Sequence, residues 1–470
     1  MARPLAFVAP LTIIYVIAVA VLLPCNVAAD SSKPIWEQEQ TPAMLVQLRR
    51  EWFPPPRPSA RSIPSCGTKR DYEKIPSKRD VGHFFLTSSV DKKAAERYDT
   101  IRVLGRGAQG LVIMALDKLK GGVVAIKKAG LKGSARELKL LQALQGSDDI
   151  EKVENVLMPR DPKSASSIYV AYERMVMPMH KMHTMWGSSH HEVPKSAMQR
   201  ILFSIVRAVH YMHTNGVVHL DIKPENVMIA ADCSPRIVDL GIARRLYDSK
   251  GNEVIFGGNA VKHGSHPPEY THKTIHSLGR LKLGADMAKS SDLWSLGMVL
   301  LSALHGGRPL ARFREVANMK HEYYGELLGA MLGRPGERAL KKHYADSLQK
   351  SYMRQSKTPK IPMWKVFPNV DRAALKMVMR LLRMDPEART SAKDILRDPY
   401  FKSVRESAWY NPATADKLKP DPRISELLNA KKNPAGGQAA LVYELSLAYS
   451  PEAEAAFRAN TTPRGMADAL

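Results

Sequence analysis

Cysteine is scarce in this chain of 470 residues, which contains only Cys25, Cys66 and Cys233. The three cysteines lie far apart, and the sequence shows no Cys/His spacing typical of a zinc site. We therefore do not expect a protein held together by a disulfide framework or by structural zinc. We interpret Cys233 as a free thiol in a β-turn.

Acidic residues are also in short supply, because 46 Asp and Glu stand against 70 Lys and Arg, and the formal net charge is +24 at pH 7. Such a balance suits acidic protein substrates, an anionic membrane surface or nucleic acid, and it is equally compatible with background composition. Of these partners we expect nucleic acid least. No internal repeat is evident, and the length allows two lobes with large cores plus extensions.

A long apolar run lies at the N-terminus. Arg3 provides a short positive region, thirteen residues at 11–23 are almost all apolar, and 27–29 offer small residues for cleavage. This pattern predicts a secretory signal peptide at 1–29, followed by secretion or retention in a secretory organelle. The rival interpretation is an uncleaved single-pass anchor with the rest of the chain in the lumen, because the run reaches nineteen residues when counted from Leu5.

Residues 30–97 form a polar stretch with proline-rich pieces. We interpret them as an N-terminal extension with little regular structure. Within it, residues 43–52 have the pattern of a short amphipathic helix. That helix suits packing against the following domain, and it also suits contact with a membrane surface.

Residues 217–241 read VVHLDIKPENVMIAADCSPRIVDLG. Phosphoryl transfer needs a carboxylate that orients the attacking hydroxyl, and hard oxygen ligands that hold Mg²⁺ beside the phosphates. HLDIKPEN resembles the catalytic loop of eukaryotic protein kinases, and VDLG resembles their magnesium-binding motif. The resemblance implies that Asp221 is the catalytic carboxylate and that Asn226 and Asp239 hold the metal. Lys223 resembles the lysine of Ser/Thr kinases that steadies the transferred phosphate.

Residues 104–112 read LGRGAQGLV, in which Gly105, Gly107, Gly110 and Val112 match a glycine-rich phosphate-binding loop. Alone this motif also occurs in dinucleotide-binding folds. The residues that follow favour a hairpin instead of a strand-to-helix unit, because two apolar strands flank a Gly-Gly turn.

The two predicted strands span 112–116 and 123–127. The second reads VVAIKK and resembles the V-A-I-K strand of kinases, with Ala125 beside the nucleotide and Lys127 on its phosphates. Residues 134–144 have helical apolar periodicity, and Glu137 resembles the helix-C glutamate that pairs with this lysine. Only ten residues separate the two, so either the connector is short and the helix begins late, or Glu137 is a surface charge.

A short apolar strand at 168–172 leads into the hinge between the lobes by the same resemblance. Tyr172 then takes the gatekeeper position, and Glu173 and Met175 lie on the hinge whose backbone binds adenine. A helix predicted at 196–215 delivers the chain to the catalytic loop.

The catalytic loop departs from the family at Leu220, where an arginine usually pairs with a phosphate on the activation segment. We hypothesise that activity does not depend on that phosphorylation. Glu269 and Arg389 match the structural ion pair of the family. Residues 291–297 resemble the start of a buried helix whose Asp292 braces the catalytic loop, and the long spacing before it predicts an insertion near 272–288.

The sequence predicts an α+β fold, the bilobal protein kinase fold, at 98–402. The small β-rich lobe with helix C spans 98–173 and the larger, mainly helical lobe spans 174–402, followed by a C-terminal extension at 403–470. We expect a monomeric protein serine/threonine kinase that uses ATP and Mg²⁺ on protein substrates. The alternative is a catalytically weak pseudokinase that acts as a nucleotide-binding scaffold. A secretory signal on this fold resembles the secreted rhoptry kinases of apicomplexan parasites.

Overall fold

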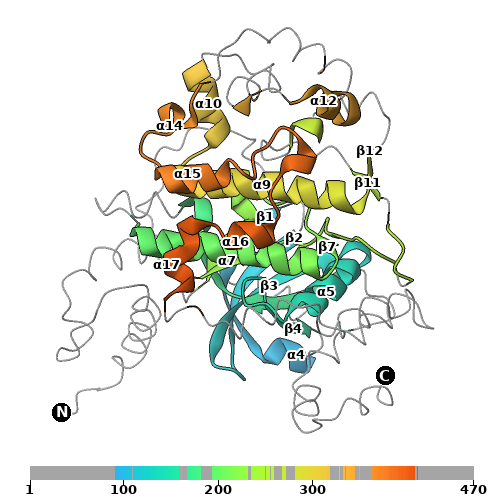
Figure 1. Ribbon diagram of the computed structural model, residues 1–470. Helices are drawn as coiled ribbons and strands as arrows, with labels where there is room; N and C mark the ends of the chain where they lie inside the picture. Colours follow the sequence, from blue (N-terminus) through green and yellow to red (C-terminus); the bar gives the residue numbers. More distant parts are fainter. Residues whose placement is uncertain are drawn as a thin grey trace, which may run out of the picture.

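The fold is described by a computed structural model (Figure 1). It covers the chain between Val90 and Tyr410 except for 91, 108–109, 158–159, 161–166, 182–192, 231–233, 249, 255, 259–266, 271–280, 318–327, 329–331, 334, 345–348, 350–360 and 408–409. The predicted signal segment, nearly all of the N-terminal extension, Cys233 and the stretch after Tyr410 therefore lie outside the described residues.

The smaller lobe is a five-stranded antiparallel sheet in the order β1-β2-β3-β5-β4. Strand β3 alternates buried and more exposed side chains over its middle, whereas the five central residues of β5 are all buried. The strands are β1 (Tyr98–Gly107), β2 (Gly110–Asp117), β3 (Gly122–Gly130), β4 (Val153–Leu157) and β5 (Ser167–Glu173). The predicted β2–β3 hairpin is confirmed, and its turn ends at Gly121, which has a φ of 72°.

Two helices accompany this sheet. Helix α4 (Lys92–Glu96) is a short regular element within the extension that was predicted to have little regular structure. Helix α5 (Leu131–Leu144) follows β3 directly, with Gly130 in an extended conformation as its N-cap. The helix thus begins earlier than predicted, and this direct strand-to-helix passage accommodates the short spacing between Lys127 and Glu137.

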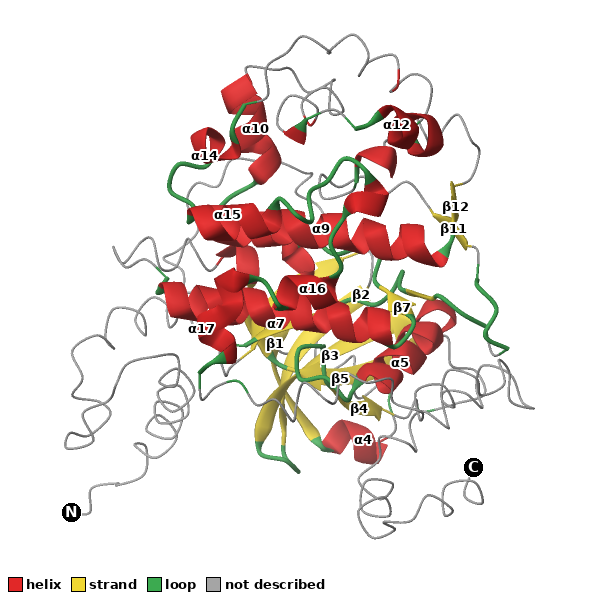
Figure 2. Cartoon of the chain, viewed as in Figure 1, coloured by secondary structure: helices red, strands yellow, loops and turns green. Residues whose placement is uncertain are grey.

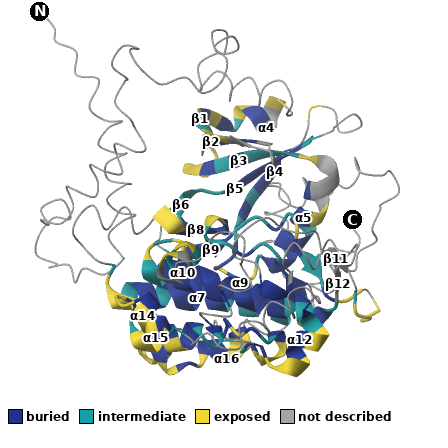
Figure 3. Cartoon of the chain, turned by 90° about the horizontal axis from the view of Figure 1, so that it is seen from above, coloured by how far each residue is buried: buried dark blue, intermediate teal, exposed yellow. Residues whose placement is uncertain are grey.

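The larger lobe is mainly helical, and Figure 2 shows its helices stacked beyond the yellow sheet of the smaller lobe. Its central helices are α7 (Lys195–Thr214) and α9 (Ala285–His305). Every residue from 290 to 303 in α9 is buried, and most of them are apolar, as expected for a helix surrounded by the core of the lobe. Figure 3 shows both helices in dark blue at the centre of this lobe.

Shorter elements surround this core. The strands are β6 (Met175–Pro178), β7 (Val217–Val218), β8 (Val227–Ala230), β9 (Pro235–Ile237), β10 (Arg244–Arg245), β11 (Phe256–Gly258) and β12 (Leu281–Leu283). The α-helices are α10 (Pro309–Ala317), α12 (Glu337–His343), α14 (Met363–Val366), α15 (Arg372–Val378), α16 (Ala392–Leu396) and α17 (Lys402–Arg405). The 3-10 helices are η2 (Met179–Lys181), η3 (Pro224–Asn226), η4 (Pro268–Tyr270), η5 (Pro386–Ala388) and η6 (Pro399–Phe401).

The start of α9 corrects one prediction. The helix begins at Ala285, six residues before the predicted start at 291, so the expected insertion at 272–288 overlaps its first turn. Alanine and methionine in this turn favour the helix, and Gly284 precedes it in an extended conformation. Within the described part of the chain, no helix is both long and apolar enough to cross a membrane.

Candidate active site

The catalytic loop follows β7, and its backbone is held by a single carboxylate from α9. Buried Asp292 accepts hydrogen bonds from the backbone N–H groups of His219 and Leu220, both at 2.8 Å. The Nε2 atom of His213 lies 3.0 Å from the same carboxylate. Leu220 has a φ of 65°, which is unfavourable for a bulky residue. These contacts confirm the bracing role predicted for Asp292 and stabilise the turn that presents Asp221.

The two oxygens of Asp221 have different surroundings. Its Oδ2 accepts hydrogen bonds from Lys223 Nζ at 2.6 Å and from Asn226 Nδ2 at 3.0 Å. Its Oδ1 is buried and has no hydrogen-bond partner among the described residues. A buried carboxylate oxygen without a donor is costly unless a ligand completes it. This arrangement leaves one oxygen of Asp221 available to accept a proton or a hydrogen bond.

Asn226 lies so that its amide oxygen is left for another group. Its Nδ2 donates to the backbone oxygen of Asp221 at 2.9 Å as well as to the carboxylate. The amide oxygen of Asn226 has no hydrogen-bond partner in the described part of the chain. An amide oxygen and a carboxylate are the hard ligands that Mg²⁺ accepts. The donor set therefore fits the metal-binding role predicted for Asn226 together with Asp239.

Asp239 lies next to the catalytic loop in a left-handed conformation, with a φ of 66°. Val238, the residue before Asp239, contacts the catalytic loop through its backbone. Its N–H donates to Asn226 O at 3.0 Å, and its carbonyl oxygen lies 3.1 Å from His219 Nε2. A Cβ atom at Gly241 would lie 3.2 Å from the Asp239 carboxylate. Glycine at 241 thus leaves room for this side chain.

Lys127 of β3 faces several carboxylates. Its Nζ lies 3.5 Å from Glu137 Oε1, so the structure pairs the two residues as predicted. Burial opposes the charge on Lys127, but Glu137, Asp239 and Glu151 outweigh it and raise its pKa. Burial also raises the pKa of Glu137. The lysine is therefore held as a cation beside the residues predicted to bind metal and phosphate.

Glu151 was not predicted as a site residue. It lies in the α5–β4 loop, two residues before β4, and its carboxylate is 3.5 Å from the backbone nitrogen of Asp239. Burial raises the pKa of Glu151 to about 8, and the nearby charge of Lys127 only partly offsets this. No motif marks this glutamate, and a charged residue in a polar loop is usually solvated. The contact with Asp239 arises only from tertiary packing.

The glycine-rich segment forms the end of the β1–β2 hairpin. Gly107 pairs with Gly110 in the antiparallel register, and positions 108–109 between them lie outside the described residues. A Cβ atom at Gly105 would meet nothing within 4 Å. Val112 pairs with Lys127 across β2 and β3. The hairpin therefore brings the glycines into the same sheet as the lysine, as the motif predicts.

The predicted gatekeeper and hinge residues lie at the end of β5 and the start of β6. Tyr172 is buried and pairs with Ala125 across β5 and β3. Glu173 ends β5, and its carboxylate accepts two hydrogen bonds from Arg236 of β9, at 3.1 and 3.2 Å. Half-buried Met175 begins β6 in the larger lobe. The side chain of Glu173 thus contacts the larger lobe, while its main chain lies where the hinge was predicted.

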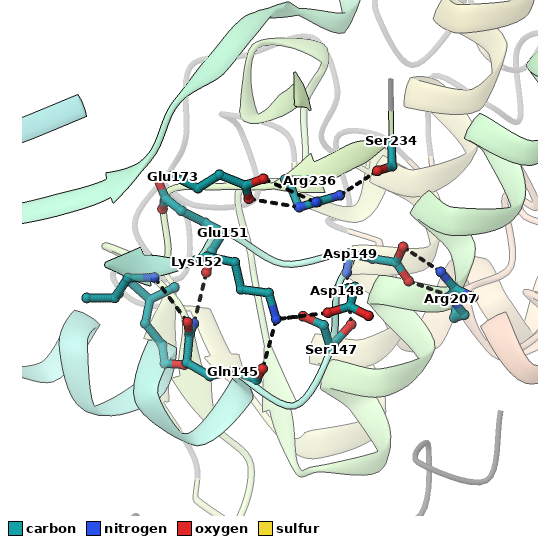
Figure 4. Close-up of polar contacts among 12 residues, drawn as sticks. Gln145, Ser147, Asp148, Asp149, Glu151, Lys152, Glu173, Arg207, Ser234 and Arg236 are labelled. Carbon is teal, nitrogen blue, oxygen red and sulfur yellow. Dashed lines mark hydrogen bonds and ion pairs between the residues drawn. The ribbon is translucent and has the colours of Figure 1, made fainter. Parts of the chain in front are cut away.

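A second carboxylate–arginine pair lies nearby and joins the α5–β4 loop to α7 (Figure 4). Asp149 is buried and accepts hydrogen bonds from both Nε and Nη2 of Arg207, at 2.5 and 2.8 Å. The same loop is closed by Lys152, whose Nζ donates to the backbone oxygens of Gln145 and Ser147, each at 2.9 Å. The loop that follows helix α5 is therefore fixed to the larger lobe by a planar, bidentate contact.

The predicted ion pair of Glu269 and Arg389 is confirmed. Both side chains are fully buried, and the two hydrogen bonds between them measure 2.6 and 2.7 Å. Arg389 also donates to the backbone oxygens of Ser290 and Arg383, each at 3.0 Å, and lies over the ring of Trp294. This pair ties the end of the activation segment to α9 and to the turn before α16.

Comparison with known proteins agrees with this geometry. The family model for the protein kinase domain matches residues 98–401. The chain therefore belongs to the protein kinase family. Among curated proteins, it is 28% identical over 340 residues to mitogen-activated protein kinase 17 of Oryza sativa subsp. japonica, covering 71% of this chain and 54% of the relative.

Two further relatives show the same level of similarity. Mitogen-activated protein kinase 7 of Oryza sativa subsp. japonica is 30% identical over 321 residues, covering 66% of this chain and 52% of the relative. Mitogen-activated protein kinase 20 of Arabidopsis thaliana is 28% identical over 318 residues, covering 66% of this chain and 49% of the relative. The chain thus spans about half the length of the curated relatives it matches.

Proposed function

We propose that this protein is an active protein serine/threonine kinase that uses Mg²⁺ and ATP. The proposal rests mainly on the different surroundings of the two carboxylate oxygens of Asp221. One oxygen is held by Lys223 and Asn226, and the other is buried and lacks a partner among the described residues. A carboxylate so arranged is oriented for a substrate hydroxyl, as general base catalysis requires.

The proposed roles of the remaining residues follow from their positions. Bound Mg²⁺–ATP supplies the phosphoryl group, and its metal neutralises charge that develops during transfer. Asn226 and Asp239 offer the metal ligands, and Lys127, held by Glu137, offers a cation to the phosphates. Gly105, Gly107 and Gly110, with Val112 and Ala125, would line the nucleotide, and the backbone at Glu173 and Met175 would contact adenine.

In the proposed reaction, Asp221 Oδ1 accepts the proton of a serine or threonine hydroxyl on the protein substrate. The hydroxyl oxygen bonds to the γ-phosphorus while the bond to the β,γ-bridging oxygen breaks, and ADP leaves. Lys223 lies 2.6 Å from the same carboxylate and is close enough to offset negative charge on the transferred group. The serine/threonine preference rests on the resemblance at Lys223.

The test is phosphate transfer from labelled ATP with Mg²⁺, using residues 31–470 and generic acidic and basic protein substrates. We expect transfer to Ser or Thr by the parent chain, and a loss of at least about a hundredfold in Asp221→Ala. A Glu225→Ala variant, which changes an exposed residue of the same loop, serves as the matched control. Nucleotide binding without transfer in the parent would contradict the proposal and favour the nucleotide-binding scaffold.

We further propose that the chain enters the secretory pathway, either with cleavage after residue 29 or as a membrane-anchored form. The apolar run at 11–23 supports this. Expression with microsomes, followed by protease protection and N-terminal sequencing, distinguishes the two forms, and a chain that is fully digested and keeps its N-terminus contradicts both. The likeness to rhoptry-type kinases, contact of the extension with a membrane surface and the monomeric state stay predictions.

A further inference from the structure

The described residues of 244–254, in the activation segment, form a small hairpin beside β7. Leu246 N donates to Gly216 O at 2.7 Å, Val254 N donates to Leu246 O at 2.8 Å, and Tyr247 pairs with Glu253. The strand β10 at its base pairs with β7, directly before the catalytic loop. The hairpin is therefore attached to β7, the strand that leads into the catalytic loop.

The turn of this hairpin is closed by its own side chain. Asp248 Oδ1 accepts from the backbone nitrogens of Lys250 and Asn252, each at 2.8 Å, and Asp248 Oδ2 accepts from Asn252 Nδ2 at 3.0 Å. Gly251 supplies the positive φ that the turn needs, at 82°. No contact in the described part of this turn requires a modified residue.

Glu253 joins this hairpin to the N-terminus of α9. Its carboxylate accepts a short hydrogen bond from the backbone nitrogen of Ala285, the first residue of the helix. The N-cap residue, Gly284, has no side chain to cap the helix. A Cβ atom at Gly284 would lie 2.5 Å from Glu253 Oε1, so glycine makes room for this carboxylate. Glu253 thus supplies from the activation segment a cap that the helix itself lacks.

An apolar cluster lies beside this cap. Val218 of the catalytic-loop strand, Leu246 of the hairpin, and Ala285 and Ala288 of α9 are buried together, with Leu220 packed against them. Leu220 stands where related kinases have an arginine that binds a phosphate. In this chain the residue contributes apolar packing between the catalytic loop, the hairpin and α9.

We propose that Glu253 is a positioning residue that holds the activation segment in its ordered form without phosphorylation. The Glu253 carboxylate interacts favourably with the N-terminus of α9, as carboxylates do at helix N-termini. The apolar cluster around Leu220 adds hydrophobic contacts between the hairpin and the same helix. The inference rests on the proposed function and specifies how the activation segment of the kinase is kept ordered. The carboxylate of Glu253 takes the place of a phosphate group that, in other kinases, is added to this segment and removed from it.

The test uses the phosphatase-treated full chain and amide hydrogen exchange at Leu246, Val254 and Ala285. In Glu253→Ala we expect exchange at these amides to be about tenfold faster, as expected for loss of a helix cap. Glu253→Gln keeps an oxygen acceptor and should remain close to the parent. Gly284→Ala should reproduce the Glu253→Ala effect, because the new methyl group displaces the carboxylate from its place.

Asp286→Ala is the matched control, since it removes an exposed acidic residue from the first turn of the same helix without touching the hairpin. In activity assays we expect Glu253→Ala to raise KM for the protein substrate and to leave KM for ATP unchanged. Equal exchange in Glu253→Ala and the parent, or an equal effect of Asp286→Ala, would overturn the inference. Lack of transfer by the parent would refute the proposed function instead, and the exchange data distinguish the two failures.

Discussion

Glu151 shows how one side chain acquires unusual chemistry from its neighbours. It lies near Lys127 but also near the carboxylates of Glu137 and Asp239. One lysine cannot neutralise three acidic groups in a partly buried site, so a proton on one of them lowers the electrostatic cost. In the absence of metal and nucleotide, burial raises the pKa of Glu151 to about 8, and this glutamate carries the proton.

This proton makes the stability of the free protein depend on pH. The pKa of Glu151 rises from an ordinary 4.5 to about 8 on folding, so the folded protein binds this proton more tightly than the unfolded chain does. The stability that it contributes is complete below pH 4.5 and is lost as the pH rises through about 8. In Glu151→Gln the side chain is uncharged at every pH and has nearly the shape of the protonated glutamate, so the variant should not lose this stability as the pH rises.

We therefore expect the stability of Glu151→Gln relative to the parent to increase by about 1 kcal/mol or more between pH 5 and pH 8.5. Chemical unfolding of both proteins without Mg²⁺ or nucleotide measures the difference. Glu225→Gln controls for the general effect of removing a carboxylate from this region. A stability difference that stays constant across this pH range would contradict the assignment.

At the scale of the element, the activation segment is held in place by contacts with other parts of the same chain. The hairpin at 244–254 is attached to β7 and to α9 by backbone pairing and the carboxylate of Glu253. Between Asp239 and Glu269 the sequence contains only two Ser or Thr residues, Ser249 and Ser265. Both lie outside the described residues, and none of the hairpin hydrogen bonds given above involves them.

We expect the double variant Ser249→Ala/Ser265→Ala to keep the phosphate-transfer activity of the parent chain, because Leu220 offers no guanidinium to a phosphate on this segment. The measurement is the initial rate with labelled ATP, for both proteins expressed in the same host and analysed by mass spectrometry for residual phosphate. Loss of activity in the double variant would show that a phosphate on this segment is required.

At the scale of the whole molecule, three carboxylate–arginine pairs join parts of the chain that are distant in sequence. Asp149 pairs with Arg207, Glu173 pairs with Arg236, and Glu269 pairs with Arg389. The first two link the α5–β4 loop and the end of β5 to the larger lobe, and the third links the end of the activation segment to the turn between η5 and α16. Planar bidentate contacts of this kind fix orientation as well as distance.

Breaking the most buried pair should therefore destabilise the fold. We expect Glu269→Ala to lower the free energy of unfolding by roughly 3–5 kcal/mol, because Arg389 would remain buried without its counter-charge. Urea unfolding measures this change. Glu315→Ala, which removes an exposed partner of Arg312, should cost about 0–1 kcal/mol. Similar losses in the two variants would contradict the assigned role of burial.

Much of the candidate site could be predicted from the sequence because its residues lie at short, fixed spacings. Asp221, Lys223 and Asn226 lie within one loop whose local turn brings their side chains together. The position of Lys127 relative to Glu137 could also be predicted, because local patterns of glycine and apolar residues encode the β2–β3 hairpin and the helix after it. For this reason the bilobal fold and the Lys127–Glu137 pair were predicted correctly.

Other features were decided by tertiary structure. The sequence by itself determined which residue types are present, the periodicity of the main helices and strands, and the spacing of the catalytic motif. It did not reveal the contact of Glu151 with Asp239 or the cap that Glu253 places on α9, because these residues lie 88 and 32 positions from their partners. The energy of a buried charge or a helix cap depends on which groups share its surroundings, and only the folded chain brings those groups together.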